Sequence, residues 1–398
     1  MKVLQLCHKP PYPKNDGGCI AIASISEAFL NQDIDLRILT VTTHKHSWIG
    51  NAWPDQLKGI TKHVQINTNL KPVSALKSLF GSGSYNVDRF FSEEFESQLE
   101  DQISTFNPDV IWLESLFMTP YIDTIRRKSK AKIILRAHNV EFKIWERLSA
   151  NSASILKKPY LSFLSKRMKE YELNAIQKVD GIAALSFEDE KFFKSLTKAE
   201  VKLVPIGIDL DQFSVPTPSE PLTLFHLGDM NWGPNEEAIN FFATKVWPLV
   251  AQSTPKAKCI LAGRNMPNSL MAKSGEGLQI MGDVEDSQMF FKENDILVLP
   301  LLSGGGMRVK MLEAMAKGKV VITTTVGAEG IRGKNGEHFI IANEAQSMAN
   351  EIDKVYQGKY DLAAIGTAAR KLVEEHFSNT AISKELNYFC QRLAGLNR

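Results

Sequence analysis

Three glycines that directly precede a helical pattern form the part of this chain with the clearest chemical potential. Gly304, Gly305 and Gly306 follow an apolar run of strand length, and apolar residues at helical spacing come after them. A strand, a glycine turn and a helix start in this order present backbone N–H groups and a positive helix end to an anion. Arg308 and Lys310 add positive charge in the first turn, where a phosphate would lie. The run therefore predicts a phosphate-binding site.

One further residue of the same helix extends this site beyond phosphate. Glu313 lies soon after Lys310, and its carboxylate could accept hydrogen bonds from sugar hydroxyls. Backbone donors, mobile cations and a carboxylate are together what a nucleoside diphosphate sugar requires. Glycine turns before helices are common, so the run alone leaves an ordinary helix start as the alternative.

A second group of polar residues stands at the end of an expected strand, Lys132–Ala137. His138, Asn139 and Glu141 come directly after it, and ligands of parallel α/β sheets collect beyond the carboxyl ends of the strands. His138 could donate to a sugar hydroxyl or stabilise charge while a bond to phosphate breaks. We therefore place His138 among the catalytic residues, and Asn139 and Glu141 near the sugar and the acceptor. A purely structural histidine is the alternative.

Glycines and one arginine mark three further strand ends where a ligand could approach the backbone. Gly17 and Gly18 stand where a helix begins after the first strand, without the GxGxxG spacing of dinucleotide-binding proteins. Gly228 follows the first strand of the second half, and Arg264 adds a positive group after the next one. We assign these four residues to donor binding, with a simple N-terminal turn as the alternative for Gly17 and Gly18.

Composition limits the class of protein. The chain has 398 residues, 43% hydrophobic and 23% charged, with a formal net charge of +2, which is ordinary for a soluble globular protein. Its four cysteines show neither a CxxC pair nor a metal-ligand spacing, so we expect reduced core residues in a cytoplasmic protein. We expect neither a metal nor a cofactor to be required, because backbone N–H groups with Arg308 and Lys310 could stabilise a diphosphate. Two Asp-x-Asp patterns, at 33–35 and 209–211, fall in a turn and in a linker and are interpreted as structural.

Strand-like apolar runs alternate with helix-length amphipathic segments along the chain, the pattern of parallel α/β layers. We expect two doubly wound, Rossmann-like domains, at 1–203 and at 204–379. A last helix at 380–398 has an apolar stripe, so it must pack on another element. The expected strands are 2–7, 35–42, 110–113, 132–137, 181–185 and one that begins near 201 and ends at 204–207, then 222–227, 257–262, 278–281, 296–300, 320–323 and 338–341.

Positive charge is concentrated in one segment. Arg126–Lys169 holds 13 basic residues against Glu141 and Glu146, a local charge of 13 − 2 = +11. A solvated basic helix face explains this, and so does a surface that meets anionic lipid or a phosphorylated acceptor. The second interpretation would make the protein peripheral at the inner face of a membrane. Nucleic acid is a less suitable partner, because no recognised binding module accompanies the segment.

Together these motifs resemble those of the retaining glycosyltransferases of family 4, which have the GT-B fold. The resemblance spans nearly the whole chain and depends on the order and spacing of motifs that are individually unspecific. It implies a donor bound mainly by the C-terminal domain, an acceptor bound mainly by the N-terminal domain across a cleft, and a final helix that crosses back to the first domain. The motifs are Gly17-Gly18, His138-Asn139-Val140-Glu141, 204–209, 228–235, Gly263-Arg264, 304–315 and 324–330.

The resemblance also implies an activity. We expect transfer of a sugar from a nucleoside diphosphate sugar to a hydroxyl of a glycan or lipid-linked glycan, with retained anomeric configuration. Synthesis of a bacterial surface polysaccharide or lipopolysaccharide is the expected setting.

The chain departs from the family pattern at the donor site. Many members carry a Glu-x7-Glu pair; Glu313 fits its second position, which binds the donor ribose, and Gly305 stands at the first, which contacts the transferred sugar. Asp229 and Trp232 stand where many relatives have basic residues for the diphosphate, so we assign that charge to the two cations after the glycines. Two alternatives stay open: a nucleotide-sugar epimerase of the same fold, and a catalytically silent protein that only binds nucleotide sugar.

Overall fold

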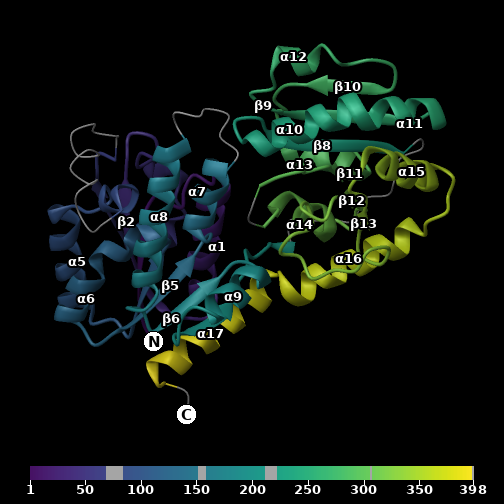
Figure 1. Ribbon diagram of the computed structural model, residues 1–398. Helices are drawn as coiled ribbons and strands as arrows, with labels where there is room; N and C mark the ends of the chain where they lie inside the picture. Colours follow the sequence, from purple (N-terminus) through teal and green to yellow (C-terminus); the bar gives the residue numbers. More distant parts are fainter. Residues whose placement is uncertain (69–83, 151–157, 211–221, 305–306, 397–398) are drawn as a thin grey trace. The chain divides into compact units, whose positions relative to one another are not determined.

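The computed structural model describes residues 1–68, 84–150, 158–210, 222–304 and 307–396 (Figure 1). The chain forms two compact units, Met1–Gly207 together with Asn379–Arg398, and Ile208–Ser378. Each unit contains one parallel sheet with helices packed on it, so the predicted fold class of two Rossmann-like domains is confirmed. Residues 204–207 belong to the first unit, since Val204 is buried in its core.

The first unit is built on a seven-stranded parallel sheet in the order β3-β2-β1-β4-β5-β6-β7. The order reverses at β1, which lies between β2 and β4. Open α/β sheets bind ligands at such a switch point, beyond the carboxyl ends of the strands. The strands are β1 Lys2–Cys7, β2 Asp35–Thr42, β3 Thr61–Gln65, β4 Val110–Glu114, β5 Lys132–Ala137, β6 Gly181–Ala184 and β7 Glu200–Leu203.

Alternating strand residues of this sheet feed two separate apolar clusters. In β1, Leu4 and Leu6 belong to one cluster, whereas Val3 and Cys7 belong to the other. Because successive side chains of a strand point to opposite faces, both faces of the sheet are covered by helices. The helices are α1 Gly17–Leu30, η1 Gly50–Ala52, α2 Asp55–Lys58, α4 Tyr85–Asp88, α5 Glu93–Phe106, η2 Leu116–Tyr121, α6 Ile122–Lys128, α7 Glu141–Ala150, α8 Lys158–Ala175, α9 Phe187–Lys194 and α17 Asn379–Ala394.

The final helix, α17, belongs to the first unit although it follows the whole second unit in sequence. Its apolar stripe, Ile382, Leu386 and Phe389, is buried in the same cluster as residues of α1. The 3.6-residue period of a helix places these positions on one face. The stripe thus explains why the chain returns to the first unit.

The second unit is built on a six-stranded parallel sheet in the order β10-β9-β8-β11-β12-β13. The strands are β8 Thr223–Asp229, β9 Lys258–Arg264, β10 Leu278–Met281, β11 Ile296–Leu299, β12 Val321–Thr323 and β13 Ile340–Ile341. The helices are α10 Gly233–Phe241, the π-helical segment η4 Phe242–Val246, α11 Trp247–Ser253, α12 Asn268–Met271, α13 Ser287–Glu293, α14 Val309–Ala316, α15 Ala345–Tyr356 and α16 Leu362–His376. The order reverses at β8, which lies between β9 and β11.

One strand was not predicted. β3, Thr61–Gln65, lies at the edge of the first sheet, and only Val64 of its five residues is buried. An edge strand that is exposed on most of its length needs no apolar run, so hydrophobic periodicity gives no signal for it.

None of the helices in the described part of the chain combines the length and the hydrophobicity that a membrane span requires.

Candidate active site

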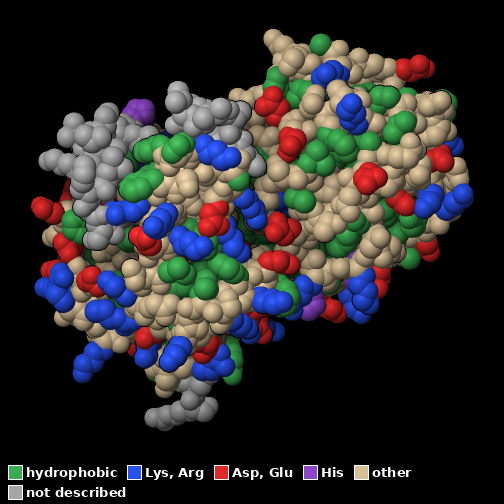
Figure 2. Space-filling view, in the orientation of Figure 1, with side chains coloured by type: hydrophobic (Ala, Val, Ile, Leu, Met, Phe, Trp, Pro, Cys, Tyr) green, Lys and Arg blue, Asp and Glu red, His purple; other side chains and the backbone are tan. Residues whose placement is uncertain are grey.

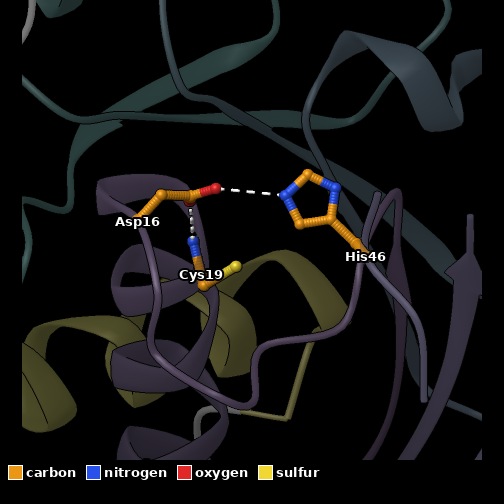
Figure 3. Close-up of side chains that lie close together, drawn as sticks. All are labelled: Asp16, Cys19 and His46. Carbon is orange, nitrogen blue, oxygen red and sulfur yellow. Dashed lines mark hydrogen bonds and ion pairs between the residues drawn. The ribbon is translucent and has the colours of Figure 1, made fainter. Parts of the chain in front are cut away.

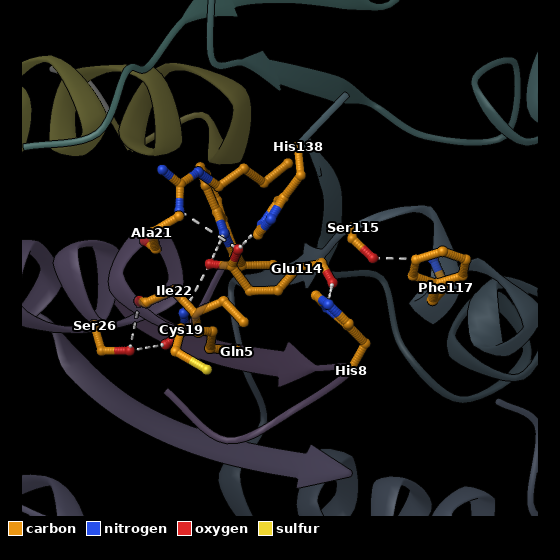
Figure 4. Close-up of polar contacts among 12 residues, drawn as sticks. Gln5, His8, Cys19, Ala21, Ile22, Ser26, Glu114, Ser115, Phe117 and His138 are labelled. Carbon is orange, nitrogen blue, oxygen red and sulfur yellow. Dashed lines mark hydrogen bonds and ion pairs between the residues drawn. The ribbon is translucent and has the colours of Figure 1, made fainter. Parts of the chain in front are cut away.

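Polar side chains from three neighbouring strands meet at the carboxyl edge of the first sheet (Figure 4). His8 directly follows β1, Glu114 is the last residue of β4, and His138 directly follows β5. These strands are hydrogen-bonded neighbours, with Cys7 in register with Glu114 and Glu114 with Arg136. The topology therefore gathers residues that are distant in sequence beside the switch point of the sheet.

Glu114 is the centre of this group and is fully buried. Its carboxylate accepts hydrogen bonds from Gln5 Nε2, Trp112 Nε1 and His138 Nε2, each at 2.8 Å. The guanidinium of Arg136, also fully buried, lies 3.5 Å from Glu114 Oε2. Burial alone would raise the pKa of Glu114, but the charge of Arg136 and the hydrogen bonds hold it below its ordinary value. Glu114 is therefore a fixed anion beneath His138.

This anion orients His138. Because Glu114 is ionised and accepts from His138 Nε2, we assign the ring proton to Nε2 and a lone pair to Nδ1. Burial holds the pKa of His138 below its ordinary value although Glu114 acts in the opposite direction. A neutral, oriented imidazole at a sheet edge can accept a hydrogen bond from a substrate hydroxyl, or stabilise charge with its fixed dipole.

Asn139 and Glu141, the other residues predicted here, lie where the chain enters α7. Asn139 Nδ2 donates to Glu141 Oε1 at 3.5 Å, and Glu141 is the first residue of the helix. Burial raises the pKa of Glu141. The start of α7 is held by another carboxylate, Glu172 of α8, which accepts from the backbone N–H groups of Glu141 and Phe142 at 3.1 and 2.9 Å.

Glu172 makes the stability of the protein depend on pH. Burial raises its pKa from 4.5 to about 8, so folding favours the protonated form. Its contribution to stability is complete below the unfolded-state pKa and is lost as the pH rises through about 8. Between about pH 5 and 8 the free energy of unfolding should fall more steeply for the wild type than for Glu172→Gln, as measured by urea denaturation. Parallel pH profiles of the two proteins would contradict this.

Gly17 and Gly18 begin α1, whose N-terminus is capped by the preceding residue (Figure 3). Asp16 Oδ1 accepts from the backbone N–H of Cys19 at 2.9 Å and from Lys9 Nζ at 2.7 Å. A Cβ atom on Gly18 would lie 2.5 Å from Lys9 Nζ, which is why this position suits glycine. The helix end thus already has a carboxylate of its own, and donor binding by these two glycines stays a prediction.

Asp16, Cys19 and His46 bring their ligand atoms within 4.8 Å of one another. Their hydrogen bonds give this cluster another explanation. His46 Nε2 lies 3.2 Å from Asp16 Oδ2, and the bonds from His46 and Lys9 hold the pKa of Asp16 well below its ordinary value against the effect of burial. Burial raises the pKa of the Cys19 thiol to about 11, which disfavours the thiolate that binds metals. We interpret the cluster as an ion-paired helix cap.

The glycine-rich run of the second unit meets an aromatic side chain from another strand end. The guanidinium of Arg308 lies over the ring of Trp232, 5.0 Å from its centroid, and Arg308 is buried. Gly304 has a φ of +104°, and a Cβ atom there would lie 2.8 Å from the Trp232 ring. Only glycine suits both conditions. Gly305 and Gly306, also predicted for this site, lie outside the described residues.

The helix that follows, α14, differs from α1 at its N-terminus. Arg308 is the N-cap residue, and no side chain of the described residues caps the helix. The N–H group of Met311 donates to the carbonyl oxygen of Arg308 at 2.9 Å. The N–H groups before it precede the first intrahelical acceptor, so they can bind an anion together with the positive helix end. The arginine expected to bind phosphate therefore lies at an uncapped helix end.

Lys310 and Glu313, the other predicted residues of α14, lie close together. Lys310 Nζ is 3.7 Å from Glu313 Oε2 and 5.6 Å from the centroid of the Phe291 ring. The lysine side chain is 39% exposed and the glutamate side chain 22%, so both heads reach solvent. Such a pair is weak and can rearrange around a ligand.

Gly228 and Arg264 end the neighbouring strands β8 and β9. A Cβ atom on Gly228 would lie 2.8 Å from Asn235 Nδ2, so the glycine allows close packing within the unit. Arg264 is paired with Asp229 at 3.5 Å, and its side chain is 58% exposed. The glycine thus has a packing role, and donor binding by both residues stays a prediction.

Sequence reasoning missed His8, Glu114 and the contact of Trp232 with Arg308. Glu114 lies one residue beyond the expected strand 110–113, since a charged residue does not continue an apolar run. From the sequence, Trp232 is only a residue that stands where many relatives have a basic one. The available signal was its place beyond a strand that neighbours the one before the glycines, since β8 pairs with β11.

Comparison with known proteins bears on the second unit directly. Residues 221–358 match the family model Glycosyl transferases group 1. This glycosyltransferase match includes the glycine-rich run, α14 and Trp232. A protein of Klebsiella pneumoniae described as an uncharacterized 44.6 kDa protein in the cps region is 22% identical over 395 residues, 96% of this chain and 97% of that protein.

Solved structures resemble the chain over nearly its full length. Sucrose-phosphate synthase from Thermosynechococcus elongatus matches with a TM-score of 0.72 and 15% identity over 100% of both chains. HepE from Anabaena, in complex with UDP-glucose, matches with a TM-score of 0.66 and 13% identity over 98% of this chain and 100% of that chain. The lipopolysaccharide outer core galactosyltransferase WaaB matches with a TM-score of 0.63 and 13% identity over 97% and 98%. At such low identity these likenesses show the fold.

Proposed function

We propose that the protein is a retaining glycosyltransferase that moves a sugar from a nucleoside diphosphate sugar to an acceptor hydroxyl. The observation that carries this proposal is the uncapped N-terminus of α14, where the guanidinium of Arg308 lies over the Trp232 ring beside Gly304. This end offers backbone donors and a planar cation to one anion. The family match of residues 221–358 and the solved complex of HepE with UDP-glucose support a nucleotide sugar as that ligand.

The proposed chemistry places charge where the second unit can stabilise it. Breaking the bond between the sugar and the diphosphate leaves positive charge on the sugar and negative charge on the leaving group. Arg308, Lys310 and the amides of the glycine-rich run would stabilise the leaving diphosphate. Arg308 is buried over Trp232 before the reaction, so its charge costs little reorganisation. We therefore propose that departure of the diphosphate requires no metal.

The first unit would bind the acceptor. His138, fixed by Glu114, provides a neutral imidazole, and Asn139 and Glu141 provide further polar groups at the same sheet edge. We propose a glycan or lipid-linked glycan as acceptor. The relative from a cps region and the fold likeness to a lipopolysaccharide galactosyltransferase support a role in bacterial surface polysaccharide or lipopolysaccharide synthesis.

We further propose that the protein is cytoplasmic and binds peripherally to the inner face of the membrane. Of the basic segment Arg126–Lys169, we assign the lipid contact to α7 and α8. Basic residues of α6 already pair with carboxylates: Arg127 lies 3.4 Å from Glu96, and Lys128 lies 3.0 Å from Glu100. The helices α7 and α8 instead combine basic side chains with large apolar ones that are 37–51% exposed, namely Ile144, Leu148, Tyr160 and Phe163. Figure 2 shows hydrophobic and basic side chains interspersed where these helices lie.

Vesicle binding tests this contact. The double variant Leu148→Ser/Phe163→Ser should bind vesicles containing phosphatidylglycerol about tenfold more weakly, because two apolar anchors are lost. Met289→Ser, at a side chain 54% exposed in the second unit, is the matched control and should bind as the wild type does. Equal binding by all three proteins in a sedimentation assay would refute the proposed surface.

The function itself is tested with a panel of UDP-, GDP-, ADP- and TDP-sugars. We expect one donor class to raise the melting temperature selectively, since a ligand that binds only the folded state stabilises it. Mass spectrometry should then detect slow hydrolysis of the same donor to the nucleoside diphosphate and free sugar. Conversion of one nucleotide sugar into another would favour an epimerase, and stabilisation without turnover across acceptors would favour a silent binding protein.

A further inference from the structure

We propose that His8 binds a hydroxyl group of the saccharide that receives the sugar. Its Nε2 atom would accept the hydrogen bond, beside His138 as the first such acceptor of this site. The inference rests on the proposed function and adds to it a positioning residue that selects the acceptor. His8 directly follows β1, the strand at which the order of the first sheet reverses. It thus lies where ligands of such sheets collect.

The backbone fixes the tautomer of His8. Its Nδ1 atom lies 2.8 Å from the carbonyl oxygen of Glu114, an acceptor that cannot donate, so Nδ1 carries the proton (Figure 4). Since the ring is neutral, Nε2 then holds a lone pair. Burial and the neighbouring His138 hold the pKa of His8 well below its ordinary value, which keeps the ring in this neutral form.

His8 and His138 are both oriented by Glu114, through different atoms of that residue. Glu114 holds both rings, His8 through its backbone carbonyl and His138 through its carboxylate. Each ring donates one N–H inward, so each has one unprotonated nitrogen left, Nε2 in His8 and Nδ1 in His138. The ring centroids are 5.6 Å apart and the planes are nearly perpendicular, at 82°. Two acceptor nitrogens on neighbouring rings suit a ligand with several hydroxyl donors, as a saccharide has.

Two aromatic side chains form an apolar environment beside His8. Phe117 and Phe90 lie with ring centroids 5.6 and 6.3 Å from that of His8, and they stack on each other at 4.8 Å. Saccharides present C–H groups beside their hydroxyls, and apolar walls with a few placed polar atoms are typical of small-molecule sites. The walls also reduce the access of water to Nε2, which strengthens a hydrogen bond made there.

If His8 had a purely structural role, only its Nδ1 atom would matter, through the hydrogen bond to the carbonyl oxygen of Glu114. The two amide side chains separate these roles, because the terminal amide of asparagine reaches the place of Nδ1 and that of glutamine reaches the place of Nε2. His8→Asn keeps a donor for the Glu114 carbonyl and loses the outer acceptor. His8→Gln provides an outer amide oxygen and loses the inner donor.

The experiment is nitrogen-15 NMR on histidine-labelled protein with UDP, GDP or ADP bound, with His8 signals assigned from their loss in His8→Asn. The probes are the methyl glycosides of glucose, galactose, mannose and N-acetylglucosamine. We expect a protonated Nδ1 and an unprotonated Nε2, and a shift of Nε2 alone when at least one glycoside is added. The dissociation constant of that glycoside should rise about tenfold in His8→Asn and stay near the wild-type value in His8→Gln.

Three results would overturn the inference: a protonated Nε2, an Nε2 signal that no glycoside moves, or unchanged glycoside binding by His8→Asn. If the protein binds a nucleoside diphosphate and cleaves its sugar donor while Nε2 stays unmoved, the inference fails and the proposed function stands. If it binds no nucleotide at all, the proposed function fails instead. Melting temperatures of both variants report whether either substitution disturbs the fold.

Discussion

Arg308→Ala should slow release of the nucleoside diphosphate about 100-fold or more while the protein stays folded. Removing one preorganised donor to a developing anion typically costs about 2.7–4 kcal/mol of transition-state stabilisation. Arg308 is buried against Trp232, so its guanidinium is held in place before the ligand arrives. The measurement is the steady-state rate of nucleoside diphosphate release with the donor identified in the panel.

Two variants make this result specific. Arg308→Lys keeps the charge but loses the planar group that lies on Trp232, so an intermediate rate is expected. Arg370→Ala removes another partly buried arginine of the second unit, whose partners are Glu374 at 2.8 Å and the carbonyl of Ala316 at 2.9 Å. That control should lower stability and leave the rate of a folded sample unchanged. A near-normal rate for Arg308→Ala would mean that the diphosphate binds elsewhere.

The second large effect concerns stability. Glu114→Ala should lower the free energy of unfolding by about 3–5 kcal/mol, because the fully buried Arg136 would lose the charge that compensates it. Gln5 Nε2 and Trp112 Nε1 would lose their acceptor as well. Urea denaturation monitored by circular dichroism measures the change.

The double variant Glu114→Leu/Arg136→Met separates the lost charge pair from lost packing. Removing both charges should recover most of the stability, since an apolar pair can replace a buried ion pair at little cost. Glu375→Ala removes a glutamate that pairs with Lys371 at 3.8 Å, with both side chains more than half exposed, and should cost at most about 1 kcal/mol. A similarly small loss for Glu114→Ala would contradict a paired, ionised Glu114.

The contribution of Glu114 to stability has a defined pH dependence. The folded-state pKa of Glu114 lies below its ordinary value, so its contribution to stability is present above the unfolded-state pKa and is lost as the pH falls through the folded-state pKa. The stability difference between wild type and Glu114→Gln should therefore shrink in acid. The dependence for Glu172 has the opposite sign, because burial raises that pKa to about 8.

Most of the fold could be predicted because its strands are buried on both faces and therefore read as apolar runs. β1, β4 and β5 are examples, with nearly every residue buried. β3 gives no such signal, since one of its faces and much of its length are exposed. Hydrophobic periodicity reports burial, and an edge strand is stabilised mainly by its hydrogen bonds to one neighbour.

The site could be predicted in part for a related reason. His138 could be predicted because it directly follows a strand whose carboxyl end can face a ligand, and Arg308 because it follows a glycine run at the start of a helix. Glu114 and Arg136 lie inside or at the end of strands, and their pairing depends on the register of β4 with β5. Sequence patterns specify which residues alternate on a strand but not which neighbour each one meets. Contacts of this kind require the assembled sheet.

Phosphorus-31 and proton NMR of the protein mixed with its sugar donor test the central claim most directly, because they follow the diphosphate and the sugar separately. The account predicts that the signals of the diphosphate sugar are replaced by those of free nucleoside diphosphate, and that Arg308→Ala largely abolishes this change. Phosphorus signals of an intact diphosphate sugar beside a changed sugar ring, or release unaffected by the loss of Arg308, would contradict it.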